Sequence, residues 1–348
     1  MAPSTRNHGL DGIRGLAVAL VILFHVAAPG FSGAFFGVDM FFVLSGFVIW
    51  GALLHRAATG RPESGRRFLE RRLLRVGPAL LPVLAVSVAG ALLIFLPDDR
   101  TDALRAAGAA LLFVSNLLFA GENDYFAGHN AQPLLHTWSL SVEMQLYLLV
   151  PILSSLCARA GPDRRPWLLG GIGVVAFVAG EILWRLAPEP AYFLPVSRLW
   201  EFLAGALMAT LAADGRLADR PARGVGLVGL AMLAGVLWLQ KDQVWSNTSA
   251  LLPVAGTLAL LWACVRNRPP RILTTAPAIF LGEISYSLYL WHLPVLVMAD
   301  YLIPGRPGTA EIIACLLVST GLATLSWRFL ERPFLSLSTR QLRQAVGQ

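Results

Sequence analysis

The chain has 348 residues, of which 56% are hydrophobic and only 14% are charged, and its mean hydropathy is +0.62. A soluble domain carries roughly 25% charged residues, so this composition excludes a soluble globular protein. The net charge of +7 does not indicate a nucleic-acid partner, because the arginines lie in the gaps between apolar runs and not on one polar face. The three cysteines lie in apolar segments without metal-ligand or disulfide spacing, and we interpret them as packing residues.

Apolar runs of about 20 residues, the length that crosses a bilayer, recur along the whole chain. The first run faintly resembles a signal peptide, but Asp11, Arg14 and His25 interrupt it, so we interpret it as a retained first helix. The expected fold is a single all-α membrane domain over residues 1–348, a bundle of about ten transmembrane helices with a cytoplasmic tail from about residue 331. The helices are expected at 10–29, 33–54, 76–97, 136–157, 167–187, 197–213, 224–240, 248–265, 277–298 and 310–330.

An eleventh apolar run, 103–120, is less hydrophobic and contains Arg105 and Asn116. Arginine-rich connections, which indicate the cytoplasmic side of a membrane, occur at 55–75, 158–166, 214–223, 266–271 and in the C-terminal tail. All of these fall on one side only if 103–120 does not cross. We therefore expect 98–135 to stay on the outer side, with 103–120 re-entrant or lying against the bundle, and both termini to be cytoplasmic.

Ionisable residues recur inside the apolar runs. Each costs roughly 2.5–3.5 kcal/mol at mid-bilayer on insertion scales, so it needs a partner, an aqueous cavity or a function. In the first helix, LDGIRGLAVALVILFH, Arg14 and His25 are eleven positions apart, so they project from one face about 16 Å apart along the axis. Asp39 is expected at outer depth in the second helix, in GVDMFFVLSGFVIW. A buried hydrogen-bonding role is the alternative for His25, and for Asp11, Arg185 and Glu331 we favour snorkelling at helix ends.

Two later helices carry a polar face. PLLHTWSLSVEMQLYLLVP places His136, Ser139 and Glu143 at spacings of three and four, so they share a face that is expected to look into the bundle. In LGEISYSLYLWHLPV, Tyr286 lies next to a second such row, which is formed by Ser285, Tyr289 and His292. Packing is the alternative role for the histidines, and membrane-interface belts are the alternative for the tyrosines.

The segment FLERRLLRVGPALLP is an amphipathic stretch that leads into the third helix and contains Arg71, Arg72 and Arg75. Paired guanidinium groups suit phosphates. A generic positive-inside anchor or a lipid headgroup site is the alternative. Arg14, which is expected at the same depth, favours the phosphate site.

Five motifs in chain order resemble the integral membrane acyltransferase 3 family, which includes bacterial O-antigen, exopolysaccharide and macrolide O-acyltransferases. Arg14 and His25, separated by ten residues, match the family pattern, and they are followed by GVDMFFVLSGF, RRLLRVGP, HTWSLSVEMQLYL and ISYSLYLWHLP. The family pattern usually has a second Glu where this chain has Met144, which leaves Glu143 as the carboxylate at that point.

The resemblance implies transfer of an acyl group, typically acetyl, from acyl-CoA to a hydroxyl of a carbohydrate or glycosylated acceptor in the bacterial inner membrane. Acyl-CoA is a co-substrate, and neither a bound cofactor nor a metal is expected. Because acyl-CoA is rich in phosphate, its expected docking groups are Arg14, Arg71, Arg72 and Arg75.

The chemistry requires a base, because a sugar hydroxyl must lose its proton as it attacks. His25 is the candidate base, or it carries the acyl group transiently. Glu143 or Asp39 is the candidate partner for the other ring nitrogen of His25, where a carboxylate would set the tautomer. Candidates for contacts to the acceptor or the oxyanion are His136, Ser285, Tyr286, Tyr289 and His292.

Two alternative functions stay open on the sequence. One is acylation of a macrolide-like secondary metabolite. The other is a proton-coupled transporter or an exporter of acylated glycans, although the inverted repeats and matched broken helices that are typical of transporters are not evident.

Overall fold

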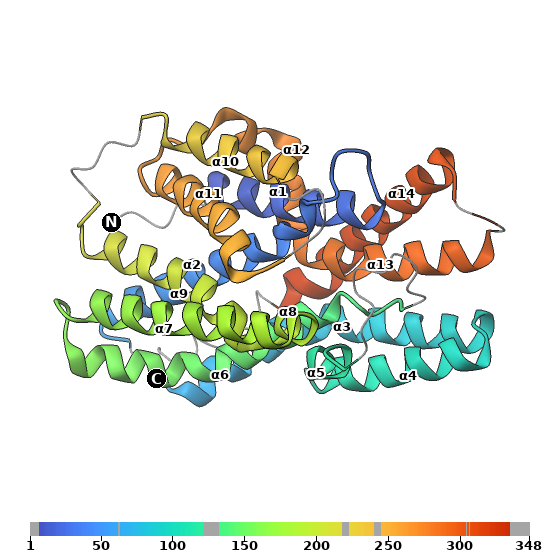
Figure 1. The fold of residues 1–348 in the computed structure, drawn as a ribbon, viewed down its shortest axis with the longest axis horizontal. Helices are drawn as coiled ribbons and strands as arrows, with labels where there is room; N and C mark the ends of the chain where they lie inside the picture. Colours follow the sequence, from blue (N-terminus) through green and yellow to red (C-terminus); the bar gives the residue numbers. More distant parts are fainter. Residues whose placement is uncertain are drawn as a thin grey trace. The chain divides into compact units, whose positions relative to one another are not determined.

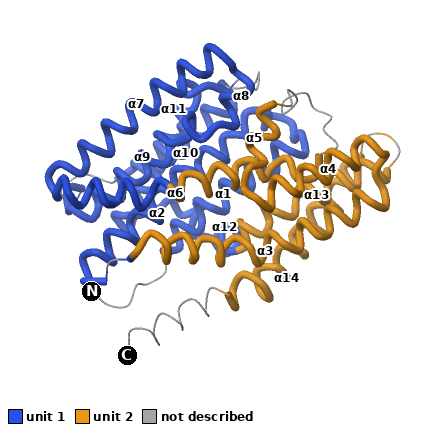
Figure 2. The backbone as a smooth tube through the Cα atoms, turned by 90° about the horizontal axis from the view of Figure 1, so that it is seen from below, with its two compact units in different colours: residues 1–63, 149–283 blue, residues 64–148, 284–348 orange. Residues whose placement is uncertain are grey.

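The computed structural model describes residues 7–61, 63–121, 132–217, 223–239, 245–303, 305 and 307–334. The regular structure of these residues is helical throughout and contains no strand (Figure 1). The chain forms two compact units, each built from two separate stretches of sequence (Figure 2). Unit 1 comprises residues 1–63 and 149–283, and unit 2 comprises residues 64–148 and 284–348.

Unit 1 is a helical unit in which α2 packs closely against α9, and α1 against α12. A Cβ atom on Gly46 of α2 would lie 1.9 Å from the carbonyl oxygen of Phe202, so these backbones touch directly. Its helices are α1 (His8–His25), η1 (Ala34–Phe36), α2 (Gly37–Ala58), α7 (Arg165–Leu186), α8 (Pro188–Phe193), α9 (Pro195–Ala213), α10 (Val225–Leu239), α11 (Asn247–Val265), η2 (Arg271–Thr274) and α12 (Ala276–Glu283). The second half of α6 (Thr137–Ala160) also belongs to unit 1.

Unit 2 contains the first half of α6, and in it α13 packs against both α3 and α14. Ser64 caps α3, because its side chain accepts a hydrogen bond from the amide of Arg67. The other helices are α3 (Gly65–Ile94), α4 (Pro97–Leu111), α5 (Ser115–Phe119), α13 (Ser285–Leu302), α14 (Thr309–Ser326) and η3 (Trp327–Glu331).

The expected all-α, multi-pass fold is confirmed. Among the described residues, eight segments are long and apolar enough to cross a membrane: His8–His25, Ala34–Ala58, Gly65–Ile94, Thr137–Ala160, Arg165–Leu186, Pro188–Ala213, Asn247–Val265 and Thr309–Phe334. The helix expected at 224–240 is present as the shorter α10. The total of about ten crossings stays a prediction.

Several expected helix boundaries differ in the structure. The first helix ends at His25 and not near residue 29, because Ala27 has a φ of 50°. The third begins at Gly65, so the arginine-rich stretch is part of a continuous 30-residue helix. The helix expected at 277–298 is interrupted at Ile284. On its α12 side, Gly282 allows close contact with the backbone of Asp11, whereas α13 packs within unit 2.

The run 103–120 is divided between α4 and α5. The 15 residues of α4 extend about 22 Å, which is less than the roughly 30 Å of a bilayer core. The short α5 is held to α6 by buried polar contacts. The Ser115 and Ser141 hydroxyls lie 2.8 Å apart, and the side-chain amides of Asn116 and Gln145 bond to each other at 2.8 and 3.2 Å. Contact with the bundle is thus confirmed for α5, while the side of the membrane stays a prediction.

Candidate active site

Polar side chains line one face of α6. Ser139, Glu143 and Tyr147 follow one another at steps of four residues, which confines them to an arc of about 80° and to about 12 Å along the helix. His136 lies in the turn immediately before α6, whereas it was expected on the helix face, and all four residues belong to unit 2. The expected inward orientation is confirmed for His136 and Ser139, which are 1% and 8% exposed, while Glu143 is half-buried.

A buried histidine cluster lies at the N-terminal end of this face. The His136 ring lies 5.3 Å from the rings of both Tyr289 and His292 on α13, measured between centroids. The Tyr289 hydroxyl donates to the carbonyl oxygen of His136 at 2.8 Å and lies 2.6 Å from the Ser139 hydroxyl. The structure therefore brings together His136, Tyr289 and His292, which belong to two motifs far apart in the sequence.

The other two candidates on α13, Ser285 and Tyr286, lie in its first turn. Ser285 is completely buried. The Tyr286 hydroxyl donates at 2.8 Å to the carbonyl oxygen of Val76 on α3. The adjacent Tyr286 therefore contacts the arginine-bearing helix and not the histidines.

An arginine and carboxylate cluster lies at the other end of the α6 face. The Tyr147 hydroxyl donates a hydrogen bond to Glu143. The Arg72 guanidinium lies 5.3 Å from the ring centre of Phe68 and 5.7 Å from that of Tyr147. Arg72 also interacts electrostatically with Arg71, Arg75 and Glu143. This half-buried surface thus has an excess of guanidinium groups, which suits an anion.

Of the three helix-end residues that were expected to snorkel, one does so and two are buried. Arg185 conforms to this expectation, because its side chain is 77% exposed and pairs with Glu181 on its own helix. Asp11 and Glu331 are buried instead, at 9% and 8% exposure. Glu331 lies in the π-helical turn η3 and accepts a hydrogen bond from Ser287 of α13. Apolar periodicity does not reveal a π-helical turn, so the burial of this carboxylate inside unit 2 could not be predicted from the sequence.

Arg14 and His25 lie on the continuous helix α1 of unit 1, as expected, and both are half-buried. The Nδ1 atom of His25 lies 2.8 Å from the carbonyl oxygen of Val21. Because a carbonyl oxygen only accepts, Nδ1 carries the proton in this contact, and the lone pair of the neutral ring is on Nε2. The backbone carbonyl of Val21 therefore sets this tautomer.

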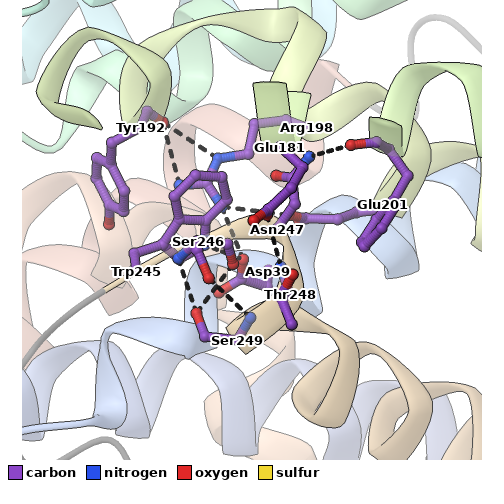
Figure 3. Close-up of polar contacts among 11 residues, drawn as sticks. Asp39, Glu181, Tyr192, Arg198, Glu201, Trp245, Ser246, Asn247, Thr248 and Ser249 are labelled. Carbon is purple, nitrogen blue, oxygen red and sulfur yellow. Dashed lines mark hydrogen bonds and ion pairs between the residues drawn. The ribbon is translucent and has the colours of Figure 1, made fainter. Parts of the chain in front are cut away.

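Asp39 is part of a buried ion cluster that the sequence reading missed (Figure 3). Arg198 Nη1 on α9 donates to Asp39 at 2.7 Å and to Glu201 at 3.2 Å, and Trp245 donates to Asp39 at 3.1 Å. Arg198 Nε and Nη2 donate to the carbonyl oxygen of Tyr192 at 3.2 and 3.1 Å. The sequence signal for this cluster was the pair Arg198 and Glu201, two charged residues three positions apart in an apolar helix. Charged residues in such a helix need a partner.

In the described part of the chain, no group of three or more His, Cys, Asp or Glu side chains is placed to hold a metal ion.

Comparisons with known proteins agree with the arrangement of motifs. Residues 7–328 match the model of the family described as "Acyltransferase domain". The chain is 34% identical to the putative membrane-bound transacylase BcsY of Komagataeibacter xylinus over 340 residues, which cover 97% of this chain and 85% of that protein. It is 31% identical to the O-acetyltransferase OatA of Staphylococcus aureus, over 93% of this chain but only 56% of that protein.

A putative O-acetyltransferase of Staphylococcus aureus is 27% identical over 94% of this chain and 57% of its own length. The chain thus spans little more than half of these two O-acetyltransferases. No solved structure matches it. The family model nevertheless covers nearly the whole sequence, across both units. The chain belongs to the acyltransferase 3 family, and it is a multi-pass membrane acyltransferase.

Proposed function

We propose that the protein is an O-acyltransferase that moves an acyl group, with acetyl the expected one, from acyl-CoA to a hydroxyl of a carbohydrate or glycosylated acceptor. Membership of the family supports acyl transfer, and the names of two relatives support a hydroxyl acceptor and an acetyl group. The carbohydrate class rests on the resemblance of the motifs. The mechanism rests on one observation, the contact between His25 Nδ1 and the carbonyl oxygen of Val21.

Unit 2 supplies the groups that would bind the donor. Arg71, Arg72 and Arg75 lie half-buried on the N-terminal part of α3, and Arg72 lies next to two aromatic rings. Guanidinium groups bind phosphates through paired N–H donors, and acyl-CoA carries several phosphates. Arg14, on α1 of unit 1, stays a donor-binding candidate from the sequence.

His25 would act as the general base through Nε2. The acceptor hydroxyl attacks the thioester carbonyl carbon and gives its proton to Nε2, and a C–O bond forms. When the intermediate collapses, the C–S bond breaks and CoA leaves, taking the proton from the imidazolium to become the free thiol. A transient acyl-histidine is the alternative role for His25. His136, Tyr289 and His292 would contact the acceptor or the developing oxyanion.

The proposed location is the inner membrane of a bacterium, with both termini cytoplasmic. The described arginines of the connections 55–75, 158–166 and 266–271 support this orientation. A periplasm-sensitive reporter fused at Gly128, a position outside the described residues, should report the outer side. A cytoplasmic signal there would overturn the orientation.

The test of the proposed function is acetyl-CoA consumption by the purified chain, with CoA release as the readout. His25→Ala should keep acetyl-CoA binding but lose transfer by roughly 10²–10⁴-fold, the effect of a missing general base. Glu143→Gln should cause a smaller loss. A folded His25→Ala protein with near-normal turnover would move the base to His136 or His292. No acetyl-CoA consumption by the wild type would favour a transporter.

The acceptor is identified by what the enzyme modifies in cells. Mass spectrometry of envelope glycans and small metabolites, with and without the gene, should show acylated carbohydrate only when the gene is present. Loss of acylation from a macrolide-like metabolite alone would overturn the carbohydrate class while leaving the acyltransferase.

A further inference from the structure

Tyr147 has two contacts of different kinds in the cluster of arginines and Glu143. Its ring lies under the Arg72 guanidinium, and its hydroxyl donates to Glu143. We infer that Tyr147 is a positioning residue, which holds the donor-binding Arg72 through its ring and orients Glu143 through its hydroxyl. This inference rests on the proposed function, because it assigns a role within the same acyl-CoA site.

The ring contact prepares Arg72 for an anion. A guanidinium that stacks on aromatic rings uses its flat face, so the N–H donors at its edge stay available for phosphate oxygens. Phe68 and Tyr147 together restrict the side chain before a ligand binds. The Nε atom of Arg72 is buried and has no hydrogen-bond partner among the described residues. A buried donor without an acceptor is unfavourable, so a ligand oxygen fits there.

The hydroxyl contact orients the carboxylate. Glu143 is half-buried and lies one helical turn before Tyr147 on the same face of α6. A hydrogen bond from a buried phenol restricts the carboxylate to fewer rotamers. The hydroxyl contact with Glu143 and the ring contact with Arg72 place the three groups in one cluster.

These two contacts can be separated by substitution. Tyr147→Phe keeps the ring under Arg72 and removes only the hydroxyl, whereas Tyr147→Leu removes both. If Tyr147 were merely a packing residue, Tyr147→Phe would leave the kinetics unchanged, because the ring that fills the core is kept.

The experiment measures acetyl-CoA binding and CoA release by the full chain in lipid nanodiscs. Tyr147→Phe should leave the KM for acetyl-CoA within about twofold and lower kcat roughly tenfold, as expected when a carboxylate loses a hydrogen bond. Tyr147→Leu should lower kcat similarly and also raise KM, because Arg72 loses one ring. The double variant Tyr147→Phe, Glu143→Gln should be no slower than Glu143→Gln alone, because the hydroxyl acts through the carboxylate.

Tyr301→Phe is the matched control, because the Tyr301 hydroxyl also donates to a carboxylate, Asp99, but its ring stacks on Phe95. It should retain wild-type kcat and KM. Wild-type kinetics in Tyr147→Phe, or additive effects in the double variant, would overturn the role of Tyr147 while the proposed function stands. A wild-type protein that neither binds nor consumes acetyl-CoA would overturn the proposed function itself, and this inference with it.

Discussion

Each unit of the molecule contains an arginine that lies over aromatic rings and near carboxylates. The two arginines differ in whether their buried N–H donors have hydrogen-bond acceptors. In unit 1, Arg198 is completely buried, lies 3.8 Å from the ring centre of Trp245, and donates to two carboxylates and a backbone carbonyl. In unit 2, Arg72 is half-buried, and its Nε has no acceptor among the described residues.

This difference separates a structural charge cluster from a binding site. A guanidinium that leaves water needs carboxylates of the protein to pair with it, and Asp39 and Glu201, 1% and 0% exposed, pair with Arg198. Around Arg72, by contrast, further guanidinium groups raise the positive charge. Asp39 was expected in the catalytic machinery, and its contacts with Arg198 and Trp245 now favour a role in holding α2, α9 and the start of α11 together.

The largest effect is expected from breaking the Arg198 cluster. Arg198→Met should lower the free energy of unfolding by roughly 3–5 kcal/mol, because it leaves buried carboxylates without their cation. Thermal unfolding of the purified protein would show this as a large fall in Tm. The matched control removes every charge, Asp39→Asn with Arg198→Met and Glu201→Gln, and should be more stable than Arg198→Met alone. Equal stability of Arg198→Met and the wild type would contradict the structural role.

The second-largest effect is expected at Arg72, whose Nε has no acceptor among the described residues. Arg72→Ala should raise the Kd for acetyl-CoA roughly 10- to 150-fold, the loss of a charge-assisted contact worth about 1.5–3 kcal/mol, with little change in Tm. Arg14→Ala in unit 1 should weaken binding to a similar extent. Added salt should weaken binding by the wild type more steeply than binding by Arg72→Ala. Unchanged affinity in a folded variant would exclude the substituted arginine from donor binding.

A smaller effect is expected at the helix end beside the Arg198 cluster. Ser246 caps α11, because its hydroxyl accepts from the amide of Ser249 at 3.0 Å and the Ser249 hydroxyl accepts in return from Ser246 (Figure 3). Ser246→Ala should therefore cost about 1 kcal/mol of stability, seen as a modest fall in Tm, without changing the KM for acetyl-CoA. A selective kinetic defect with normal Tm would show that this end of unit 1 takes part in binding.

The smallest effect is expected at Arg66, an exposed arginine of unit 2 that serves as a comparison for Arg72. Arg66 lies on the same helix as Arg72, but its side chain is 91% exposed and pairs with Glu70 on the helix surface. Exposed ion pairs contribute little, so Arg66→Ala should change neither Tm nor the Kd for acetyl-CoA measurably. If Arg66→Ala weakened donor binding as much as Arg72→Ala, donor binding would depend on the overall positive charge of α3. The specific contacts of Arg72 would then not explain it.

The sequence alone determined the helical membrane character, the approximate position of most membrane-spanning helices, and the spacing of His136, Ser139 and Glu143 and of Tyr289 and His292. Apolar run length and helical periodicity are local properties, so they can be read from the sequence. The tertiary structure decided which of these residues contact each other. The contacts of His136 with His292 and of Arg72 with Tyr147 join segments that are distant in the chain. It also decided that Val21 sets the His25 tautomer, that Arg198 saturates Asp39, and that Glu331 is buried, because hydrogen-bond partners and burial depend on packing, which periodicity does not encode.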